Sequence, residues 1–362
     1  MPYAAPGQLM QVGAGIWRAA AAFTTPLLPD DYLTLINPLW SARRLHGEVE
    51  RVIPETEDAA TLVIRPGWHW PAHRAGQWVM VGARIEGVWS SRAYSITSPA
   101  GELGRFSITV KAVAHGRVSA HLVRRTAPGD VLRLALPSGE FVLPDRVPPR
   151  ILFLTGGSGV TPVMGMLRTL AGGSSRPDVV HVHSARRPSD VIFGAELRAL
   201  SRQLPGYRLY EQHTETNGRF TLGRLDELCP DWRQRPTWAC GPAGQLADIE
   251  AHWEQAGADD RLHIERFRPA FFAAPDADGG SVTFTRTGRE AAAPAGTPLL
   301  EVGEHAGVAM PSGCRMGICF SCVAPLRSGQ VRDLRTGQVH GEEGQLVQTC
   351  VSGAAGTCAV DL

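Results

Sequence analysis

Residues 151–162, with the sequence ILFLTGGSGVTP, join a continuous apolar run to a glycine turn and a proline. The run Ile151 to Thr155 is typical of a buried strand, and the following segment, Val163 to Leu170, has the pattern of a helix. The glycines and Pro162 interrupt this uncharged stretch before it reaches the roughly 20 residues that a membrane span needs. We therefore predict the opening of a βαβ unit, with the glycine turn between its first strand and its helix.

Further strand-like runs alternate with helical segments after this unit. Leu197, Leu200 and Leu204, for example, lie on one helical face. Such alternation predicts an open parallel α/β sheet over residues 147–267. The runs are 179–184, 208–211, 237–240 and 262–267.

The residues on either side of this sheet have other patterns. Residues 44–146 hold short β-type runs separated by turn residues, which predicts an antiparallel β-barrel. Residues 268–280 are rich in proline and glycine, which is typical of a linker, and a third domain follows over 281–362. Residues 1–43 carry scattered apolar side chains without a regular period. We expect this N-terminal extension to pack on the protein's own domains or on a partner. The β-type runs are 48–53, 60–65, 78–83, 92–97, 105–110 and 130–135.

Composition and charge exclude several classes of protein. The chain has 362 residues, of which 43% are hydrophobic, and this length predicts two or three domains. Lys and Arg number 36 against 35 Asp and Glu, so the net charge of +1 gives no reason to expect nucleic acid as a partner. The N-terminus lacks a basic start, and Arg18 interrupts its apolar stretch. We therefore expect no signal peptide and a cytoplasmic location.

The cysteines indicate metal or redox chemistry. Their number, seven, is odd, which argues against a disulfide framework in a reducing compartment. Cys314, Cys319, Cys322 and Cys350 have the spacing C-x4-C-x2-C with a distant fourth cysteine, which is typical of a 2Fe-2S cluster. The alternative is a structural zinc site, which usually has two close cysteine pairs. Small neighbours allow backbone N–H groups to reach the sulfurs, namely Ser312, Gly313, Gly317 and Ser321.

The segment Arg92-Ala-Tyr-Ser95 has groups that a flavin requires. Tyr94 can stack on the isoalloxazine ring, Ser95 can bond its reactive edge, and Arg92 can neutralise the pyrophosphate. The turn from His115 to Ser119 offers backbone N–H groups to the same phosphates. The alternative is an ordinary strand. The candidate flavin-binding residues are Arg92, Tyr94, Ser95, Lys111 (the only lysine of the chain), Gly116, Val118 and Ser119.

The glycine turn after the run 151–155 suits a dinucleotide pyrophosphate, since glycines permit close approach and a helix N-terminus follows. Arginines after the next strand favour NADPH over NADH, because they can hold an adenosine 2′-phosphate, although solvated arginines are the alternative. The candidate nucleotide-binding residues are Gly157, Ser158, Gly159, Thr161, Pro162, Ser184, Arg186, Arg187, Cys240, Gly241 and Pro242.

Four residues are candidates for direct roles in the reaction. Tyr94 and Ser95 would contact the flavin, and Cys240 would lie at the carboxyl edge of the sheet, where open α/β folds bind ligands. Glu265 could exchange protons with the flavin site. The alternative for Cys240 is a buried core cysteine, and the alternative for Glu265 is a surface salt bridge. Cys229 and Cys358 fit no ligand spacing, and we interpret them as packing residues.

Four motifs occur in a fixed order: RAYS (92–95), GSGVTP (157–162), CGP (240–242) and the four cluster cysteines. Together they resemble the ferredoxin-NADP reductase superfamily fused to a plant-type ferredoxin, over residues 45–362. Within it, TTPLLPDDYLTLINPLWSAR (24–43) and VRDLRTGQVH (331–340) look like the NADPH oxidoreductases that serve membrane acyl-CoA desaturases.

The resemblance implies FAD in the barrel, NADPH on the α/β sheet and a 2Fe-2S cluster in a β-grasp-like C-terminal domain. It also implies that electrons pass from NADPH through FAD and the cluster to a terminal oxygenase, most simply a membrane desaturase at the inner face of the membrane. The alternatives are a reductase of a soluble ring-hydroxylating or alkane oxygenase and a non-catalytic redox sensor or adaptor. In many plain reductases the chain ends near an aromatic residue over the flavin, whereas this chain continues past Phe267.

Overall fold

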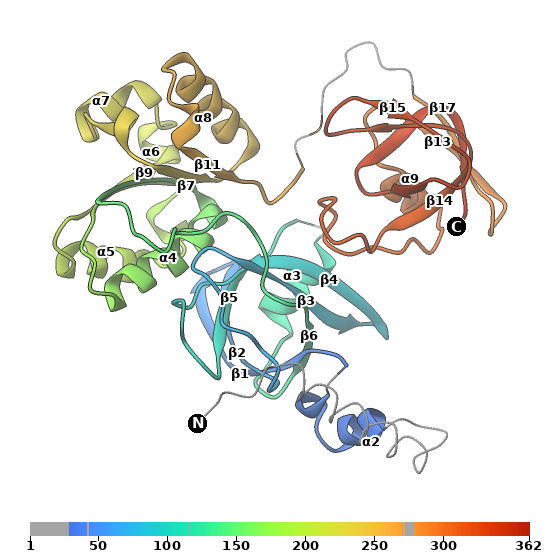
Figure 1. The fold of residues 1–362 in the computed structure, drawn as a ribbon, viewed down its shortest axis with the longest axis horizontal. Helices are drawn as coiled ribbons and strands as arrows, with labels where there is room; N and C mark the ends of the chain where they lie inside the picture. The colour runs from blue at the N-terminus through green and yellow to red at the C-terminus, as the bar shows by residue number, and fades with distance from the viewer. Residues whose placement is uncertain (1–28, 42, 115, 270, 272–278) are drawn as a thin grey trace, which may run out of the picture.

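The structure is a computed structural model that describes residues 29–41, 43–114, 116–269, 271 and 279–362. It contains three sheets, each in its own globular unit (Figure 1). The fold class predicted from the sequence is confirmed: an antiparallel barrel, an open parallel α/β sheet and a mixed-sheet domain follow one another. Within the described residues, no helix is long and apolar enough to cross a membrane.

The first unit is a six-stranded antiparallel sheet in the order β4-β3-β6-β1-β2-β5. The first and last strands of the sheet, β4 and β5, are joined by a bridge between Ile96, just after β4, and Ile108 of β5, which closes the barrel. Alternate residues of the strands, such as Val79 and Val81, point into the buried core. The elements are β1 His46–Thr56, β2 Ala59–Pro66, β3 Trp78–Ile85, β4 Val88–Ser95, β5 Phe106–Lys111, α3 Arg117–Arg124 and β6 Val131–Leu134.

The second unit is a parallel sheet in the order β11-β10-β7-β8-β9. Its central strand β7 is buried on both faces because α4 and α5 cover one side and α7 and α8 the other (Figure 1), which explains its continuous apolar run. The elements are β7 Arg150–Gly156, α4 Val160–Gly172, β8 Asp178–Ala185, α5 Gly194–Gln203, β9 Tyr207–His213, α6 Thr214–Asn217, α7 Leu225–Leu228, β10 Thr237–Cys240, α8 Ala243–Gln255 and β11 Leu262–Glu265.

The third unit is a mixed sheet in the order β13-β12-β17-β14-β15, with β16 paired to β14. The parallel pairing of β12 with β17 joins the start of this unit to its end. Its helix, α9, packs on the sheet through Leu299 and Val302. The elements are β12 Gly280–Phe284, β13 Arg289–Ala293, α9 Leu299–His305, β14 Val323–Asp333, β15 Val339–His340, β16 Leu346–Gln348 and β17 Ser352–Val360.

The described part of the N-terminal extension is largely helical, although its apolar residues show no regular period. Helix α2 covers Pro29–Ile36, and a 3-10 helix covers Pro38–Trp40. The period was missed because two turns are too short to establish one. Leu39 is buried, and the Ser41 hydroxyl donates to the Asp30 carboxylate at 2.8 Å. Trp17, Phe23, Leu27 and Leu28 lie outside the described residues.

Close backbone contacts join the barrel to the nucleotide sheet. A Cβ atom on Gly165 of α4 would lie 2.6 Å from the Ile96 carbonyl oxygen, so only glycine permits this approach. The Arg168 guanidinium donates to the Thr97 carbonyl at 2.8 Å and also pairs with Glu196. Helix α4, which starts at the glycine turn, is therefore held against the end of strand β4.

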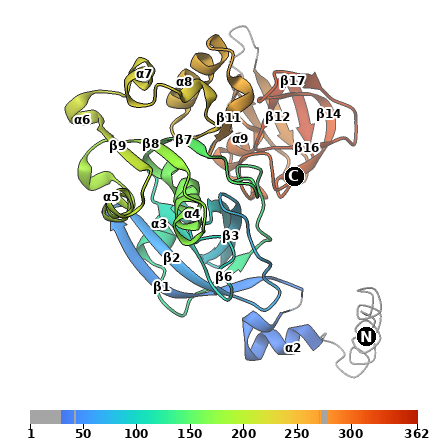
Figure 2. The same ribbon diagram turned by 60° about the vertical axis from the view of Figure 1, so that its left-hand side comes forward.

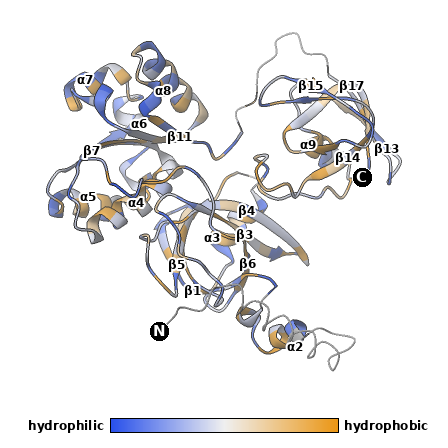
Figure 3. Cartoon of the chain, viewed as in Figure 1, coloured by the Kyte–Doolittle hydropathy of each residue, from blue (hydrophilic) through white to orange (hydrophobic). Residues whose placement is uncertain are grey.

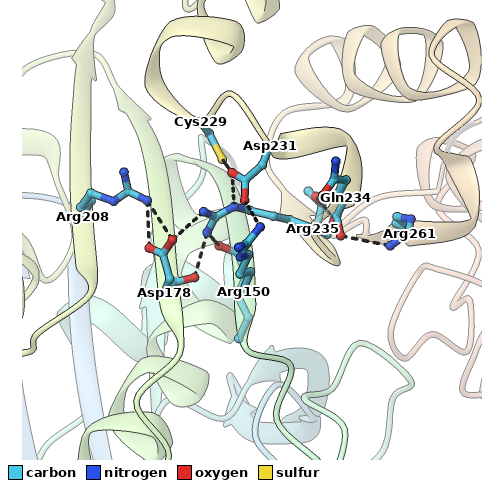
Figure 4. Close-up of polar contacts among 10 residues, drawn as sticks. Arg150, Asp178, Arg208, Cys229, Asp231, Gln234, Arg235 and Arg261 are labelled. Carbon is cyan, nitrogen blue, oxygen red and sulfur yellow. Dashed lines mark hydrogen bonds and ion pairs between the residues drawn. The ribbon is translucent and has the colours of Figure 1, made fainter.

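A buried ion-pair network lies at the edge of the parallel sheet opposite the glycine turn (Figure 4). Arg235, only 2% exposed, pairs with Asp178 at 2.6 Å and with Asp231 at 2.8 Å. It also donates to the carbonyl oxygens of Ile151 and Asp178. Arg235 thus ties the start of β7 and β8 to the segment before β10.

Candidate functional site

The end of strand β4 carries two buried polar atoms without partners. Among the described residues, neither the Tyr94 hydroxyl nor the Ser95 hydroxyl has a hydrogen-bond partner. Burial raises the pKa of Tyr94, so its phenol stays neutral. Such unsatisfied groups are costly unless a ligand bonds them. These orphaned hydroxyls fit a flavin ring at this strand.

The turn before α3 holds the other predicted flavin residues. A Cβ on Gly116 would lie 2.5 Å from Ser119 Oγ, so the turn requires glycine here. The Ser119 hydroxyl donates to the Gly116 carbonyl and accepts from the Val113 N–H, and Val118 is buried in the barrel core. Ser119 and Val118 therefore shape the turn, which leaves backbone N–H groups as the phosphate donors. His115 lies outside the described residues.

Lys111 lies elsewhere than the sequence suggested. It extends from the end of β5, pairs with Asp58 at 3.1 Å, and lines a cavity of about 450 Å³ over the carboxyl edge of the parallel sheet. That edge is where open α/β sheets bind ligands. The geometry therefore links Lys111 to the nucleotide cavity rather than to the flavin strand.

The two glycine turns of the parallel sheet meet at this edge. A Cβ on Gly159 would lie 2.0 Å from the Cys240 carbonyl oxygen, and one on Gly241 would lie 3.2 Å from the Gly156 nitrogen. Only glycines permit the turns after β7 and β10 to approach so closely. Ser158 accepts a hydrogen bond from the Thr161 hydroxyl, and Pro162 is buried in the first turn of α4. Of the predicted nucleotide-binding residues in these turns, Gly157 and Pro242 line the cavity, whereas Ser158, Gly159, Thr161, Pro162, Cys240 and Gly241 are not among its lining residues.

The far end of the cavity has the features of an anion site. Ser184 and Arg186 line it, as the sequence predicted, and so do Thr214, Arg219 and Phe220, which the sequence analysis missed. The last three follow β9, one strand further along the sheet, and nothing in their local pattern singled them out. Asp190, which also lines the cavity, pairs with Arg186 at 3.2 Å and with the exposed Arg187 at 3.1 Å, and Arg187 itself does not line the cavity.

Cys240 and Glu265 lie side by side on β10 and β11. Burial raises the pKa of Glu265 to about 8, and one of its carboxylate oxygens has no hydrogen-bond partner among the described residues. Burial and the neighbouring Glu265 also raise the pKa of Cys240, which keeps its thiol protonated. Glu265 is therefore a buried acid that gains and loses a proton near neutral pH. The surface salt bridge considered for it is excluded by this burial.

The raised pKa of Glu265 predicts how the stability of the protein depends on pH. An unfolded chain ionises this group near pH 4.5, whereas the folded chain does so only near pH 8. Because the folded state binds more protons between these values, stability must fall as pH rises from about 4.5 to 8. Glu265→Gln should therefore melt like the wild type at pH 5 and at a higher temperature at pH 8. Calorimetry at both pH values checks this, and an equal difference at both would contradict the buried acid.

The cluster loop, residues 312–322, holds three of the four cysteines and, together with Cys350 from the turn before β17, places them in two pairs. The Cys314 N–H donates to the Cys319 sulfur at 3.1 Å, and the Met316 N–H donates to the Cys314 sulfur at 3.3 Å, as the small neighbours predicted. The Cys350 thiol donates a hydrogen bond to the Cys322 sulfur, which lowers the pKa of Cys322. Two thiol pairs suit two irons, each of which takes two thiolates.

Glycines and left-handed residues hold this loop in shape. A Cβ on Gly313 would lie 2.6 Å from the Cys319 sulfur, and Gly317 has a φ of +74°. Arg315 and Phe320 also have positive φ, and the Phe320 ring is exposed. Within the described residues, no three or more His, Cys, Asp or Glu side chains converge as ligands of one metal ion. Cys229 and Cys358 are buried in apolar cores, where we interpreted them as packing residues.

Arg92 joins the flavin strand to the cluster loop. Its guanidinium donates to the Gly313 carbonyl at 3.0 Å and to the Ser91 carbonyl at 2.7 Å. Burial and the nearby Arg315 lower the pKa of Arg92. Because Cys314 follows Gly313 directly, this contact holds the cluster loop against strand β4, which also carries Tyr94 and Ser95. The pyrophosphate role predicted for Arg92 stays a prediction.

Comparison with protein families agrees with this division. Residues 70–143 match the oxidoreductase FAD-binding domain, residues 153–243 the oxidoreductase NAD-binding domain, and residues 282–355 the 2Fe-2S iron-sulfur cluster binding domain. The predicted cofactors, FAD, a 2Fe-2S cluster and NAD(P)H, are confirmed by these matches. The zinc alternative for the four cysteines is set aside by the third match.

Individual relatives cover nearly the whole chain. An NADPH oxidoreductase of Mycobacterium tuberculosis is 54% identical over 95% of this chain and 91% of its own. A glycine betaine monooxygenase reductase subunit of Pseudomonas aeruginosa is 30% identical over 87% of this chain and 96% of its own. Among solved structures, phthalate dioxygenase reductase, described as modular for electron transfer from pyridine nucleotides to [2Fe-2S], has a TM-score of 0.63 at 25% identity. It covers 88% of this chain and 98% of its own.

Proposed function

Because this chain belongs to the NAD(P)H-dependent flavin oxidoreductases of the ferredoxin-reductase type that carry a C-terminal 2Fe-2S domain, we propose that it delivers electrons from NADPH to a membrane acyl-CoA desaturase. Bound FAD accepts a hydride and releases electrons singly, which a one-electron acceptor requires. The choice of acceptor and the preference for NADPH are the parts that go beyond family membership.

The chain's own residues position these groups. The turns after β7 and β10, whose glycines permit close approach, would hold the nucleotide backbone, and the unpartnered Tyr94 and Ser95 hydroxyls would bond the flavin. Arg92 holds the cluster loop against the same strand through the Gly313 carbonyl. This Arg92 contact is the single observation that carries the proposal, because it joins the site of hydride acceptance to the site of one-electron delivery.

The position of residues 331–340 supports a desaturase as acceptor. This segment, which looks like desaturase reductases, forms the hairpin between β14 and β15. At its tip, Arg335 reaches the cluster loop, since a Cβ on Gly317 would lie 2.7 Å from its guanidinium. The segment that carries the resemblance thus borders the place from which electrons leave.

A reductase of a soluble oxygenase is the second candidate, and it is favoured by the monooxygenase reductase subunits among the relatives. The non-catalytic sensor loses its support because the family consists of oxidoreductases. The deciding experiment reconstitutes the holoprotein with NADPH and either a membrane desaturase in vesicles or a soluble Rieske oxygenase. Turnover with the desaturase alone supports the proposal, and turnover with the soluble oxygenase alone overturns it.

The cavity residues predict how NADPH is distinguished from NADH. Arg186→Ala or Arg219→Ala should raise the KM for NADPH about ten- to a hundredfold and leave that for NADH unchanged, because each removes a charge-assisted contact to the 2′-phosphate. Arg187→Ala is the matched control and should have a smaller effect, since Arg187 does not line the cavity. An unchanged ratio of the two KM values in both variants would mean that other residues bind the 2′-phosphate of NADPH.

A further inference from the structure

The N-terminal helices expose large apolar side chains at the end of the barrel away from the other two units (Figures 1 and 2). Leu35 is 76% exposed, Ile36 72% and Trp40 48%. Apolar residues on α2 are visible in Figure 3. The neighbouring Leu39 is buried, so it fixes this segment on the barrel while the other side chains project outward. Clusters of exposed apolar groups on a soluble fold mark interaction surfaces.

A group of arginines lies beside these apolar side chains. Arg44 and Arg84 are exposed. Arg133 pairs in register with Gly82 on one side and with His46 on the other, so Arg84 and Arg44 each lie two residues along the chain from a strand partner of Arg133. Arg133 also lies over the Trp89 ring at 3.8 Å. Over the described parts of the chain, none of the three arginines forms an ion pair.

Neighbouring elements hold the two groups together. The 3-10 helix lies against the start of β1, since a Cβ on Gly67 would lie 2.6 Å from the Leu39 carbonyl oxygen and 3.6 Å from that of His46. His46 is in turn the register partner of Arg133 on β6. The acid nearest to Arg84 in sequence, Glu86, pairs with Arg117. Although the chain as a whole carries a net charge of only +1, these three arginines lie near one another, and the acids of α2, Asp30 and Asp31, are in its first turn, away from Leu35 and Ile36 in its last.

We propose that this face, formed by Leu35, Ile36, Trp40, Arg44, Arg84 and Arg133, binds the surface of an anionic lipid bilayer. Exposed tryptophan and aliphatic side chains enter the headgroup region, and arginines bind the phosphates above it. A protein partner would need carboxylates in register with three arginines on separate segments, the one before β1 and the strands β3 and β6, whereas lipid phosphates can adjust laterally. This inference goes beyond the proposed electron transfer and does not depend on which acceptor is used.

Vesicle flotation of the full-length holoprotein tests the proposal. The protein should float with vesicles of phosphatidylcholine and phosphatidylglycerol, bind phosphatidylcholine alone weakly, and dissociate as salt is raised. Arg44→Glu should lower the partition coefficient about fivefold or more. The double variant Leu35→Asn with Ile36→Asn should lower it at least about tenfold. NADPH-to-ferricyanide turnover should stay unchanged in every variant, which shows that the fold is intact.

Two matched controls lie on other faces. Leu103→Asn changes an apolar side chain that is 80% exposed, and Arg202→Glu reverses an exposed charge on α5, so both should float like the wild type. Absence of flotation, or equal losses in the controls and the patch variants, would overturn the proposal. So would release by inorganic phosphate but not by chloride at equal ionic strength, because the arginines would then bind a free anion.

Discussion

Cys319→Ser should abolish electron delivery to a protein acceptor while NADPH-to-ferricyanide turnover persists. Cys319 forms one of the two cysteine pairs with Cys314, and its sulfur accepts a hydrogen bond from the Cys314 N–H. Loss of one thiolate leaves an iron without its full ligand set. Flavin reduction needs only residues of the first two units, so the ferricyanide reaction should survive. Absorbance of the purified variant and the two turnover assays measure these effects.

The same substitution outside the loop provides the control. Cys358→Ser changes a buried cysteine of the same unit that packs in its apolar core, so the iron-sulfur absorbance should remain. Equal loss of both activities in Cys319→Ser with flavin still bound would contradict the division of labour between the units.

Arg235→Ala should destabilise the nucleotide unit by about 1.5 to 3 kcal/mol, because it removes charge-assisted hydrogen bonds to the partly exposed carboxylates of Asp178 and Asp231. Exposed Arg261, which also appears in Figure 4, offers the matched control. Arg261→Ala should change the free energy of unfolding by less than about 1 kcal/mol. Calorimetry resolves the transition of this unit in each variant. Similar melting of Arg235→Ala and the wild type would mean that the network contributes nothing to stability.

The elements of each unit could be predicted from the sequence because their patterns are local. The run Ile151 to Thr155 has no polar residue before its end, since both faces of β7 are covered, and the short barrel runs end at turn residues. The closure of the barrel could not be predicted. It depends on the bridge between Ile96 and Ile108, which no local pattern encodes.

The residues of the candidate site likewise fall into those that local sequence motifs predict and those that only the folded structure brings together. The cysteine spacing and the glycine turns are contiguous motifs, so their residues were predicted before the structure. Arg219 and Lys111 were missed or placed elsewhere because they reach the nucleotide cavity from a loop and a strand that only tertiary folding brings there. The contact of Arg92 with Gly313 joins residues 221 positions apart, which sequence spacing alone cannot reveal.

The central claim is that electrons pass from the nucleotide through the flavin strand to the cluster loop within one chain. Anaerobic rapid mixing of the holoprotein with NADPH, followed at the absorbance bands of flavin and cluster, tests it most directly. We predict that the flavin band bleaches first and the cluster band next, without added acceptor and at a rate independent of protein concentration. A cluster band that stays oxidised after the flavin has bleached, or that bleaches only at a concentration-dependent rate, would contradict the claim.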